Sequence, residues 1–240
     1  MDSTTHLLVL TGAGISAESG VPTFRDAGGL WEGNAVEDVA SPQGFARDPL
    51  LVWRFYSERR ANMTNVEPNA GHRALVEIEQ RLGDRFLLVT QNIDGLHAAA
   101  GSERVIELHG NLMRSRCMVC DRAAFEDRTA YRAGVAPMCG QCKKAGKDAL
   151  LRPDIVWFGE TIARAFLDRI EAFVAAAGTG LRFLAVGTSG LVYPAAGLVD
   201  VVRQRGGRSW LVNADRPANV SSFDEVAIGT AGTLLPQLFA

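Results

Sequence analysis

Short, continuous apolar runs recur along the chain. The runs that we predict to be strands are Leu7–Leu10, Phe86–Thr90, Val105–Leu108, Ile155–Phe158, Arg182–Val186, Trp210–Val212 and Val226–Ile228. They lack a clear alternation of apolar and polar positions, a pattern that is typical of strands covered on both faces. We therefore expect a sheet that lies between two layers of helices.

Helical periodicity occupies many of the intervals between these runs. Three helices are predicted: one from the N-cap Asn69 to Gly83, one over the apolar stripe Phe166–Val174, and one from Pro194 to Gly206. Strands that alternate with helices predict an α/β protein with a doubly wound parallel sheet.

Two stretches interrupt this alternation. Residues 28–60 have a helical and loop-like pattern, and residues 114–150 are polar and contain the cysteines. We expect both to be insertions that pack together as a smaller lobe. The large domain would then consist of residues 1–27, 61–113 and 151–240, with a cleft between the two lobes.

A glycine-rich turn follows the first predicted strand. Gly12-x-Gly14-x-x-Ala17 fits the G-x-G-x-x-G/A fingerprint, in which glycines let the backbone approach a pyrophosphate at a helix N-terminus. A strand-to-helix turn can also need glycine for steric reasons alone. The chain then continues through Val21–Asp26 instead of a full helix and a second strand with an acidic end, which argues against an ordinary dehydrogenase.

The four cysteines form two C-x-x-C pairs, Cys117 with Cys120 and Cys139 with Cys142. Two disulfides could use the same residues, but disulfides belong mainly to oxidising compartments and small secreted domains. The spacing instead predicts one tetrahedral Zn²⁺ bound by four thiolates. Because no coordination position remains for water, the zinc would be structural. A redox dithiol or a set of free thiols would also be compatible with this spacing.

Composition excludes several classes of protein. The chain has 240 residues, of which 47% are hydrophobic and 22% charged, so it is neither disordered nor fibrous. Its net charge of −2 gives no bulk attraction to nucleic acid. No apolar run is long enough to cross a membrane, and the first residues lack the basic stretch of a secretory signal. We therefore expect a cytoplasmic protein with no membrane or nucleic-acid partner.

Several motifs, in order along the chain, together resemble the sirtuin family of NAD⁺-dependent protein-lysine deacylases. They are Gly12–Ser16 with Gly20–Arg25, Gln91–His97, Leu108–Gly110, the two C-x-x-C pairs, Pro153–Glu160, and Gly187–Ser189 with Asn213. The resemblance implies a Rossmann-type large domain, a small zinc lobe, and NAD⁺ and acyl-lysine meeting between them. The products would be nicotinamide, O-acyl-ADP-ribose and free lysine.

The resemblance also implies roles for individual residues. His109 would be the general base, because a ribose hydroxyl must lose a proton and imidazole titrates near neutrality. Asn92 and Asp94 would hold the nicotinamide and its ribose. The cofactor-binding residues would be Gly12, Ala13, Gly14, Ile15, Glu18, Thr23, Phe24, Arg25, Trp31, Gln91, Asn92, Ile93, Asp94, Gly187, Thr188, Ser189, Asn213, Ala214, Asp215 and Ala231. We expect His6 and His72 to pack or face solvent, and His97 to orient its loop.

A Tyr-x-x-Arg pair bears on which acyl group the protein would remove. A further helix is predicted over Leu50–Ala61, with Asp48 as its N-cap and Pro49 in its first turn. Tyr56 and Arg59 share a face of this helix and resemble the pair of the sirtuin subclass that removes succinyl and malonyl groups. A guanidinium can bind the distal carboxylate of such a group in bidentate fashion. The pair could instead be a surface arginine beside an amphipathic tyrosine. The substrate peptide would lie along Val156, Trp157, Phe158 and Gly159, and near Leu191-Val192.

Two further functions remain open at this point. NAD⁺-dependent ADP-ribosyl transfer to protein would use the same cofactor site, and a non-catalytic module would bind NAD⁺ without turnover. We expect a monomer whose partners are acyl-lysine proteins or peptides.

Overall fold

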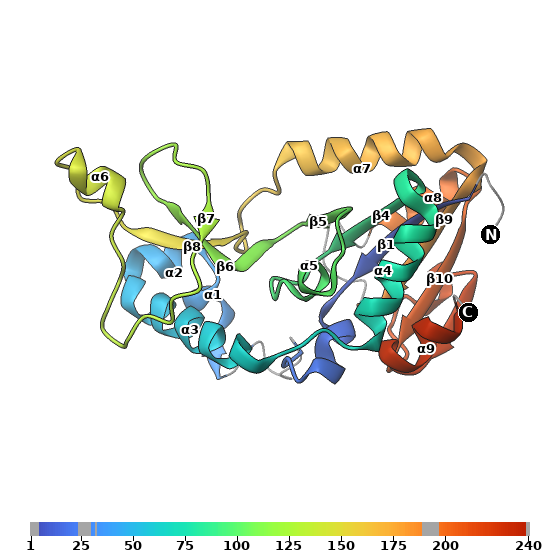
Figure 1. The fold of residues 1–240 in the computed structure, drawn as a ribbon, viewed down its shortest axis with the longest axis horizontal. Coiled ribbons are helices and arrows are strands. Elements are labelled where there is room, and N and C mark those ends of the chain that lie inside the picture. The colour runs from blue at the N-terminus through green and yellow to red at the C-terminus, as the bar shows by residue number, and fades with distance from the viewer. Residues whose placement is uncertain (1–4, 24–29, 32, 189–196, 239–240) are drawn as a thin grey trace.

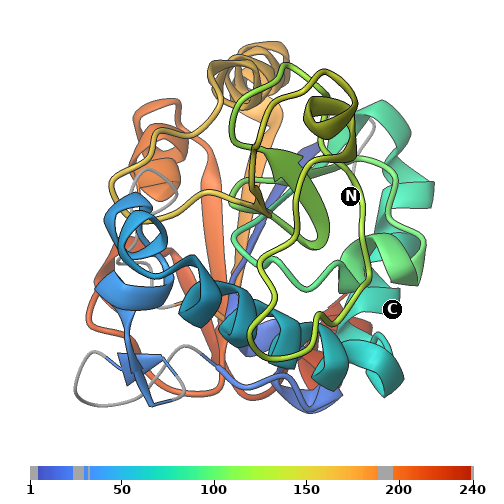
Figure 2. The ribbon, with the colours of Figure 1, turned by 90° about the vertical axis from the view of Figure 1, so that its left-hand side faces the viewer.

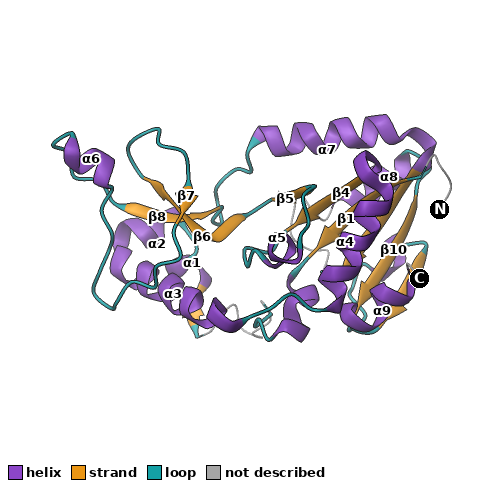
Figure 3. Cartoon of the chain, viewed as in Figure 1, coloured by secondary structure: helices purple, strands orange, loops and turns teal. Residues whose placement is uncertain are grey.

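The computed structural model describes residues 5–23, 30–31, 33–188 and 197–238. A large sheet with its helices lies at one end of the molecule, and a smaller group of strands and helices lies at the other (Figure 1). The ribbon coloured by secondary structure shows that helices cover both faces of the large sheet (Figure 3). Among the described residues, none of the helices combines the length and the apolar character needed to cross a bilayer.

The large sheet has six strands in the order β11-β10-β9-β1-β4-β5, and neighbouring strands pair in parallel. Its members are β1 (His6–Thr11), β4 (Phe86–Thr90), β5 (Val105–Glu107), β9 (Leu181–Val186), β10 (Arg208–Asn213) and β11 (Glu225–Ile228). The strand order reverses beside β1, because β4 lies on one side of it and β9 on the other. Open α/β sheets bind ligands at the carboxyl ends of the strands next to such a reversal.

Both faces of the central strand are buried. Leu8 and Leu10 pack with α7 (Arg164–Ala177) and α8 (Leu198–Gln204) on one face. Leu7 and Val9 pack with α4 (Ala70–Leu82) and α9 (Ala231–Leu238) on the other. The prediction of a doubly wound parallel sheet is therefore confirmed.

The caps of α4 agree with the sequence prediction. The Asn69 side chain accepts hydrogen bonds from the N–H groups of Gly71 and His72, and His72 Nδ1 accepts one from Asn69 N in return. Gly83 ends the helix at a φ of +57°, in the left-handed region where glycine carries no steric penalty.

The smaller lobe combines the two insertions. Its sheet contains β6 (Gly110–Cys117), β7 (Phe125–Glu126) and β8 (Leu151–Ile155) in antiparallel pairing. Its helices are α1 (Val36–Val39), α2 (Pro42–Arg47), α3 (Pro49–Asn62) and α6 (Gly140–Lys144), and Figure 2 views them from the end of this lobe. Trp53, Tyr56, Leu112 and Trp157 share one apolar core. The expected lobe is present, whereas its boundaries with the large domain and a cleft between the two remain predictions.

The remaining elements are short. They are α5 (Leu96–Ala100), the hairpin of β2 (Leu30–Trp31) and β3 (Asn34–Ala35), and the 3₁₀ turns η1 (Ala13–Ser19), η2 (Met63–Asn65), η3 (Gly83–Arg85), η4 (Gly178–Gly180) and η6 (Val220–Ser222).

The prediction for one strand is wrong. The run Ile155–Phe158 is not a strand of the large sheet; β8 ends at Ile155 and belongs to the small antiparallel sheet. The residues after it alternate in environment, since Trp157 is buried and Phe158 is exposed. Glu160 accepts a hydrogen bond from the Trp157 N–H, which turns the chain there. The predicted start of another helix, Pro194, lies outside the described residues, and α8 is described from Leu198.

Candidate active site

Polar side chains gather at the carboxyl edge of the large sheet, where β1, β4, β9 and β10 end. Gly12, Gln91 and Thr188 follow β1, β4 and β9, and Asn213 is the last residue of β10. Gln91 Nε2 donates to Thr188 Oγ1 over 3.0 Å and Gln91 N donates to Thr11 O, so the ends of β4, β1 and β9 are joined. This edge is the place where the fold predicts a nucleotide.

Glycines let the segments after β1 and β9 touch backbone to backbone. Gly12 N donates to Val186 O, and Gly14 N donates to Gly187 O over 2.8 Å. A Cβ on Gly14 would lie 2.6 Å from Gly187 Cα, and Gly187 itself has a φ of +59°. The steric reason for glycine is therefore present here. The segment after Gly12 is a 3₁₀ turn, not the α-helix of the usual fingerprint.

Asn92 and Asp94 converge on one serine hydroxyl. Asn92 Nδ2 donates to Ser16 Oγ over 3.2 Å and to Gly12 O over 3.1 Å. Ser16 Oγ donates to Asp94 Oδ2 over 2.7 Å, and Leu96 N donates to the other carboxylate oxygen. Burial raises the pKa of Asp94, although these two donors oppose the shift. Ser16 was not among the predicted contact residues, and its place inside the Gly12–Ser16 motif was its signal.

Two buried histidines lie under this group. The rings of His72 and His97 are 4.8 Å apart, and Thr11 Oγ1 is 2.8 Å from His97 Nε2. His72 Nδ1 accepts from Asn69 N, so its proton belongs on Nε2, which lies 3.5 Å from Ser16 Oγ. Burial lowers the pKa of His72 to about 4 and that of His97 well below 6.5, so both are neutral near pH 7. No local pattern in the chain indicates that these two rings meet.

His109 lies between β5 and β6, and its ring is held by the β4 end. Its Nδ1 is 3.0 Å from Gln91 O. A carbonyl oxygen only accepts, so Nδ1 carries the proton and Nε2 presents a lone pair. Burial lowers the pKa of His109, while the bond to Gln91 opposes this. The main-chain oxygen of His109 also accepts from Val156 N over 2.9 Å, which links the imidazole to the segment after β8.

The other predicted cofactor residues differ in their contacts and in their exposure. Glu18 accepts from Thr230 Oγ1 and Gly232 N, which brings its carboxylate beside Ala231 at the start of α9. Ile15 is fully buried in the core, so only its backbone can face a ligand. Ile93 packs against the small-lobe core. Thr23, Ala214 and Asp215 are exposed, and Ala13 is half-buried. Phe24, Arg25, Ser189 and the Trp31 side chain lie outside the described residues, as do Leu191 and Val192.

These residues fit a dinucleotide. Amide, carboxylate and hydroxyl groups converge at the strand ends beside the reversal of strand order, and the glycine turn lets the segments after β1 and β9 pack together there.

Tyr56 and Arg59 lie on α3 in the interior of the small lobe. Tyr56 is fully buried, and its hydroxyl accepts from Trp157 Nε1 over 3.0 Å. Arg59 is 8% exposed. Its guanidinium carbon lies 3.3 Å from the centre of the Phe55 ring, and Nη1 donates to Phe55 O. Burial raises the pKa of Tyr56, although the bond from Trp157 and the positive charge of Arg59 oppose the shift. The phenol therefore stays protonated, and Arg59 is not a surface arginine.

An ion pair that sequence analysis missed supports this region. Arg152 lies 3.4 Å from the centre of the Trp157 ring and donates to Glu160 over 2.6 and 2.9 Å. Burial would raise the pKa of Glu160, but the bonds from Arg152 and from Trp157 N lower it overall. The pair fixes Trp157, and through it the hydroxyl of Tyr56.

The four cysteine sulfurs form a compact group whose members all lie within 4.8 Å of one another. Cys117 Sγ is 3.6 Å from Cys142 Sγ, and Cys120 Sγ is 3.8 Å from Cys139 Sγ. A disulfide needs about 2 Å, whereas a tetrahedron with Zn–S bonds of about 2.3 Å has edges of about 3.8 Å. The N–H groups of Val119 and Cys120 donate to Cys117 Sγ, which favours a thiolate. The geometry fits a structural Zn²⁺, and no second group of this kind occurs within the described ranges.

Comparison with known proteins agrees with this geometry. The model of the Sir2 family matches residues 12–194. "NAD-dependent protein deacylase" of Rhodopirellula baltica is 47% identical over 240 residues, which cover 97% of this chain and 97% of the relative. "NAD-dependent protein deacylase 2" of Pyrobaculum aerophilum is 44% identical over 236 residues, covering 98% and 90%.

Two solved structures extend the comparison. A Sir2 homologue in complex with NAD has a TM-score of 0.86 and 42% identity, over 97% of this chain and 87% of the other. A Sir2–p53 peptide–NAD⁺ complex has a TM-score of 0.80 and 28% identity, over 97% and 91%. With a match over most of its length and relatives above 40% identity, the chain belongs to the Sir2 family.

Proposed function

We propose that this protein is an NAD⁺-dependent protein-lysine deacylase. The observation that carries the proposal is the lone pair of His109 Nε2, whose direction is set by the Gln91 carbonyl at the sheet edge that also bears Asn92 and Asp94. When bound, NAD⁺ supplies an electrophilic ribose carbon and nicotinamide as the leaving group. The amide oxygen of the acyl-lysine attacks that carbon.

The protein's own residues then have separate tasks. Asn92 and Asp94, fixed by Ser16, orient the nicotinamide half and hold the ribose. His109 Nε2 removes the proton from a ribose hydroxyl, which then attacks the acyl carbon. Gln91, Thr188 and Asn213 line the path toward the adenosine half, where Glu18 and the backbone of Ala231 meet.

The substrate peptide is proposed to add a strand beside Val156–Gly159. Phe158 is 53% exposed there, and no atom lies within 4 Å of a Cβ placed on Gly159. The N–H groups of Val156, Trp157 and Phe158 already donate within the chain, so the peptide would pair with the remaining backbone groups of this segment.

We further propose that the preferred acyl groups are acidic, such as succinyl or malonyl. Arg59 is almost enclosed, and a carboxylate that reaches a guanidinium in such surroundings forms a stronger bond than it would in water. The Trp157–Tyr56 hydrogen bond holds the phenol at the same place. A cytoplasmic, monomeric enzyme is part of the same proposal, and light scattering after gel filtration tests the oligomeric state.

Three measurements on one reaction mixture test the activity. Purified protein, NAD⁺ and a monosuccinyl-lysine peptide should yield nicotinamide, free lysine and O-succinyl-ADP-ribose. His109→Ala should reduce the rate at least about 100-fold. His6→Ala is the matched control. His6 begins β1, at the end of the strand opposite the site, and its ring packs on Phe173. ADP-ribose left on the peptide would indicate a transferase, and NAD⁺ binding without nicotinamide release would indicate a non-catalytic module.

A further inference from the structure

We propose that the tip of the small lobe, formed by Lys143, Lys144 and Lys147, is a docking surface for proteins that carry several acidic acyl-lysines. The inference rests on the proposed function, because such proteins are the substrates of a desuccinylase. We call these three residues the lysine cluster.

The lysine cluster contains every lysine of the chain. The other 22 of the 25 basic residues are arginines. All three lysines are exposed, and their side chains make no ion pair or hydrogen bond within the described residues. Nearby arginines behave differently: Arg114 and Arg116 pair with Asp154, and Arg128 pairs with Glu126. The cluster therefore places three exposed positive charges, outside any ion pair, within five consecutive residues.

The net charge of the chain is also unevenly distributed, and its positive part is the zinc segment. Residues 114–150 hold eight basic and four acidic residues, a net charge of +4, while the rest holds 17 against 23, a net charge of −6. Four thiolates with one Zn²⁺ would add −2, which leaves the zinc segment positive. A polyanionic partner would thus be attracted to residues 114–150 and repelled by the rest of the chain.

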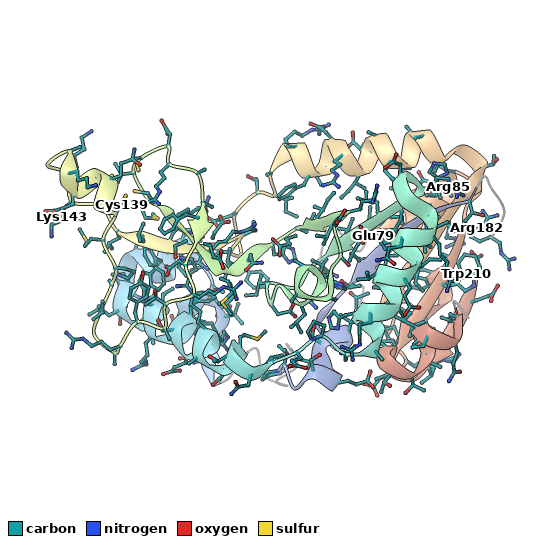
Figure 4. All side chains as sticks on the ribbon, viewed as in Figure 1. Glu79, Arg85, Cys139, Lys143, Arg182 and Trp210 are labelled. Carbon is teal, nitrogen blue, oxygen red and sulfur yellow. The ribbon has the colours of Figure 1, made fainter. Side chains whose placement is uncertain are left out.

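The backbone under the cluster is rigidly anchored. Lys143 N donates to Cys139 O and Lys147 N donates to Cys142 O, over 3.0 and 2.9 Å. The ammonium groups are therefore presented from a frame fixed by the cysteines. Figure 4 shows Lys143 beyond Cys139, at the end of the molecule away from the large sheet.

Distance separates the cluster from the reacting groups. His109 precedes β6 at one end, and Cys117 ends the eight-residue strand at the other. Gly110 pairs with Ile155 and Cys117 with Leu151, because β6 bulges between Asn111 and Ser115, so these two ends lie about 13 Å apart at about 3.3 Å per residue of β8. A bound peptide of about seven residues extends only about 10–12 Å to either side of its central lysine. The cluster lies on and just after α6, beyond the end of β6, so a folded protein reaches it more readily than such a peptide does (Figure 1).

The chemistry of acidic acylation supplies the complementary charge. Succinylation replaces an ammonium with a carboxylate, so each modified lysine changes the charge of a protein by −2. A multiply succinylated protein is consequently polyanionic, and a local basic patch accelerates its association. The Debye length of about 8 Å at physiological salt confines the effect to close approach.

The test compares two substrates, a variant of the lysine cluster and a control variant. The substrates are a carrier protein extensively modified with succinic anhydride and a monosuccinyl heptapeptide. The variant K143E/K144E/K147E is compared with R169E/R203E/R205E, which makes the same change in net charge at exposed positions of α7 and the end of α8. Zinc content and thermal melting confirm that each variant is folded, and K143Q/K144Q/K147Q provides a milder change.

At about 50 mM salt, the cluster variant should raise KM for the succinylated protein about tenfold and leave kcat and all peptide kinetics unchanged. The difference should vanish at about 0.5 M salt. Fluorescence anisotropy should show the same loss of binding, independently of turnover. Equal effects of the two variants, or an unchanged KM, would overturn the proposal. The proposal would also be overturned if the cluster variant lost binding to duplex DNA but kept its binding to the succinylated protein. Failure of the wild type to turn over the peptide would instead refute the proposed function.

Discussion

The Nδ1 atom of His109 lies 3.0 Å from the main-chain oxygen of Gln91, and this contact decides which ring nitrogen can take a proton. Gln91 is the first residue after β4, so a strand end of the large sheet determines the protonation pattern of a side chain that precedes the small-lobe sheet. Donation to a carbonyl leaves Nε2 as the base.

This relationship predicts the pH dependence of catalysis. The base must be neutral, and burial lowers the pKa of His109 below its ordinary value of 6.5. Activity should therefore persist as the pH falls to 6.5 and decline only below that value. The logarithm of kcat/KM for the succinyl peptide, measured between about pH 5 and 8, checks this. An acid limb centred above 6.5 would contradict it.

Arg59→Met should separate the two classes of acyl group. The variant removes the guanidinium but keeps a long apolar side chain over Phe55. We expect kcat/KM for desuccinylation to fall about 100-fold, as for the loss of a charge-assisted bidentate bond, and deacetylation to change by less than about threefold. Arg54→Met is the control, because Arg54 is an exposed arginine of the same helix. Parallel losses on both substrates would show that Arg59 does not read the carboxylate.

Zinc removal should unfold the small lobe before the large domain. Purified protein should contain one zinc per chain, and Cys142→Ser should reduce that content and lower the melting temperature by at least about 10 °C, since metal binding supplies folding free energy. Metal analysis and scanning calorimetry give the two values. Full stability in the metal-free protein would mean that the four cysteines serve another purpose.

The buried histidines predict a loss of stability in acid. His72 has a pKa of about 4 in the folded state and 6.5 as its ordinary value, so the unfolded chain binds the proton more readily. The free energy of unfolding should be unaffected above pH 6.5 and decrease as the pH falls toward 4, by roughly 3 kcal/mol for this residue. Urea denaturation at about pH 7 and about pH 5 measures the effect. His72→Gln should show a smaller decrease, and an equal decrease would assign the effect to other groups.

Gly187→Ala should be strongly destabilising. The φ of +59° disfavours a side chain, and a Cβ would lie 2.3 Å from Ile15 N, a backbone atom that cannot move aside. We expect a cost of at least about 3 kcal/mol. Gly20→Ala, at a φ of +84° with no neighbour within 4 Å of the added atom, should cost only about 1 kcal/mol. Chemical denaturation of both variants distinguishes steric contact from backbone strain.

The large sheet was predictable because its signals are local. Phe86–Thr90 is a strand with the predicted bounds, and Asn69 and Gly83 delimit α4 as predicted, since caps and apolar runs act within a few residues. The strand prediction for Ile155–Phe158 is wrong for the same reason. Its apolar composition matches a doubly covered strand, but Arg152 and Glu160 on either side of it turn the chain.

The site was predictable only in part. Resemblance pointed to Asn92, Asp94 and His109, each inside a short motif. Ser16 bonds to Asp94, 78 residues away in the chain, and Thr11 to His97, 86 residues away. Both contacts depend on the pairing of β1 with β4. No local sequence pattern indicates a contact between residues so far apart in the chain. The hydrogen bond between Tyr56 and Trp157 likewise joins residues 101 positions apart.

The shared core of the small lobe limits how this chain can be shortened. Trp53 and Tyr56 of α3 are covered by residues from the cysteine segment and from β8, and Trp53 Nε1 donates to Leu151 O. Excising residues 114–150 would uncover the rings of Trp53 and Tyr56, and excising residues 28–60 would remove the Tyr56 acceptor of the Trp157 indole N–H. A truncated protein of that kind should aggregate, so the two pieces can be gained or lost only together.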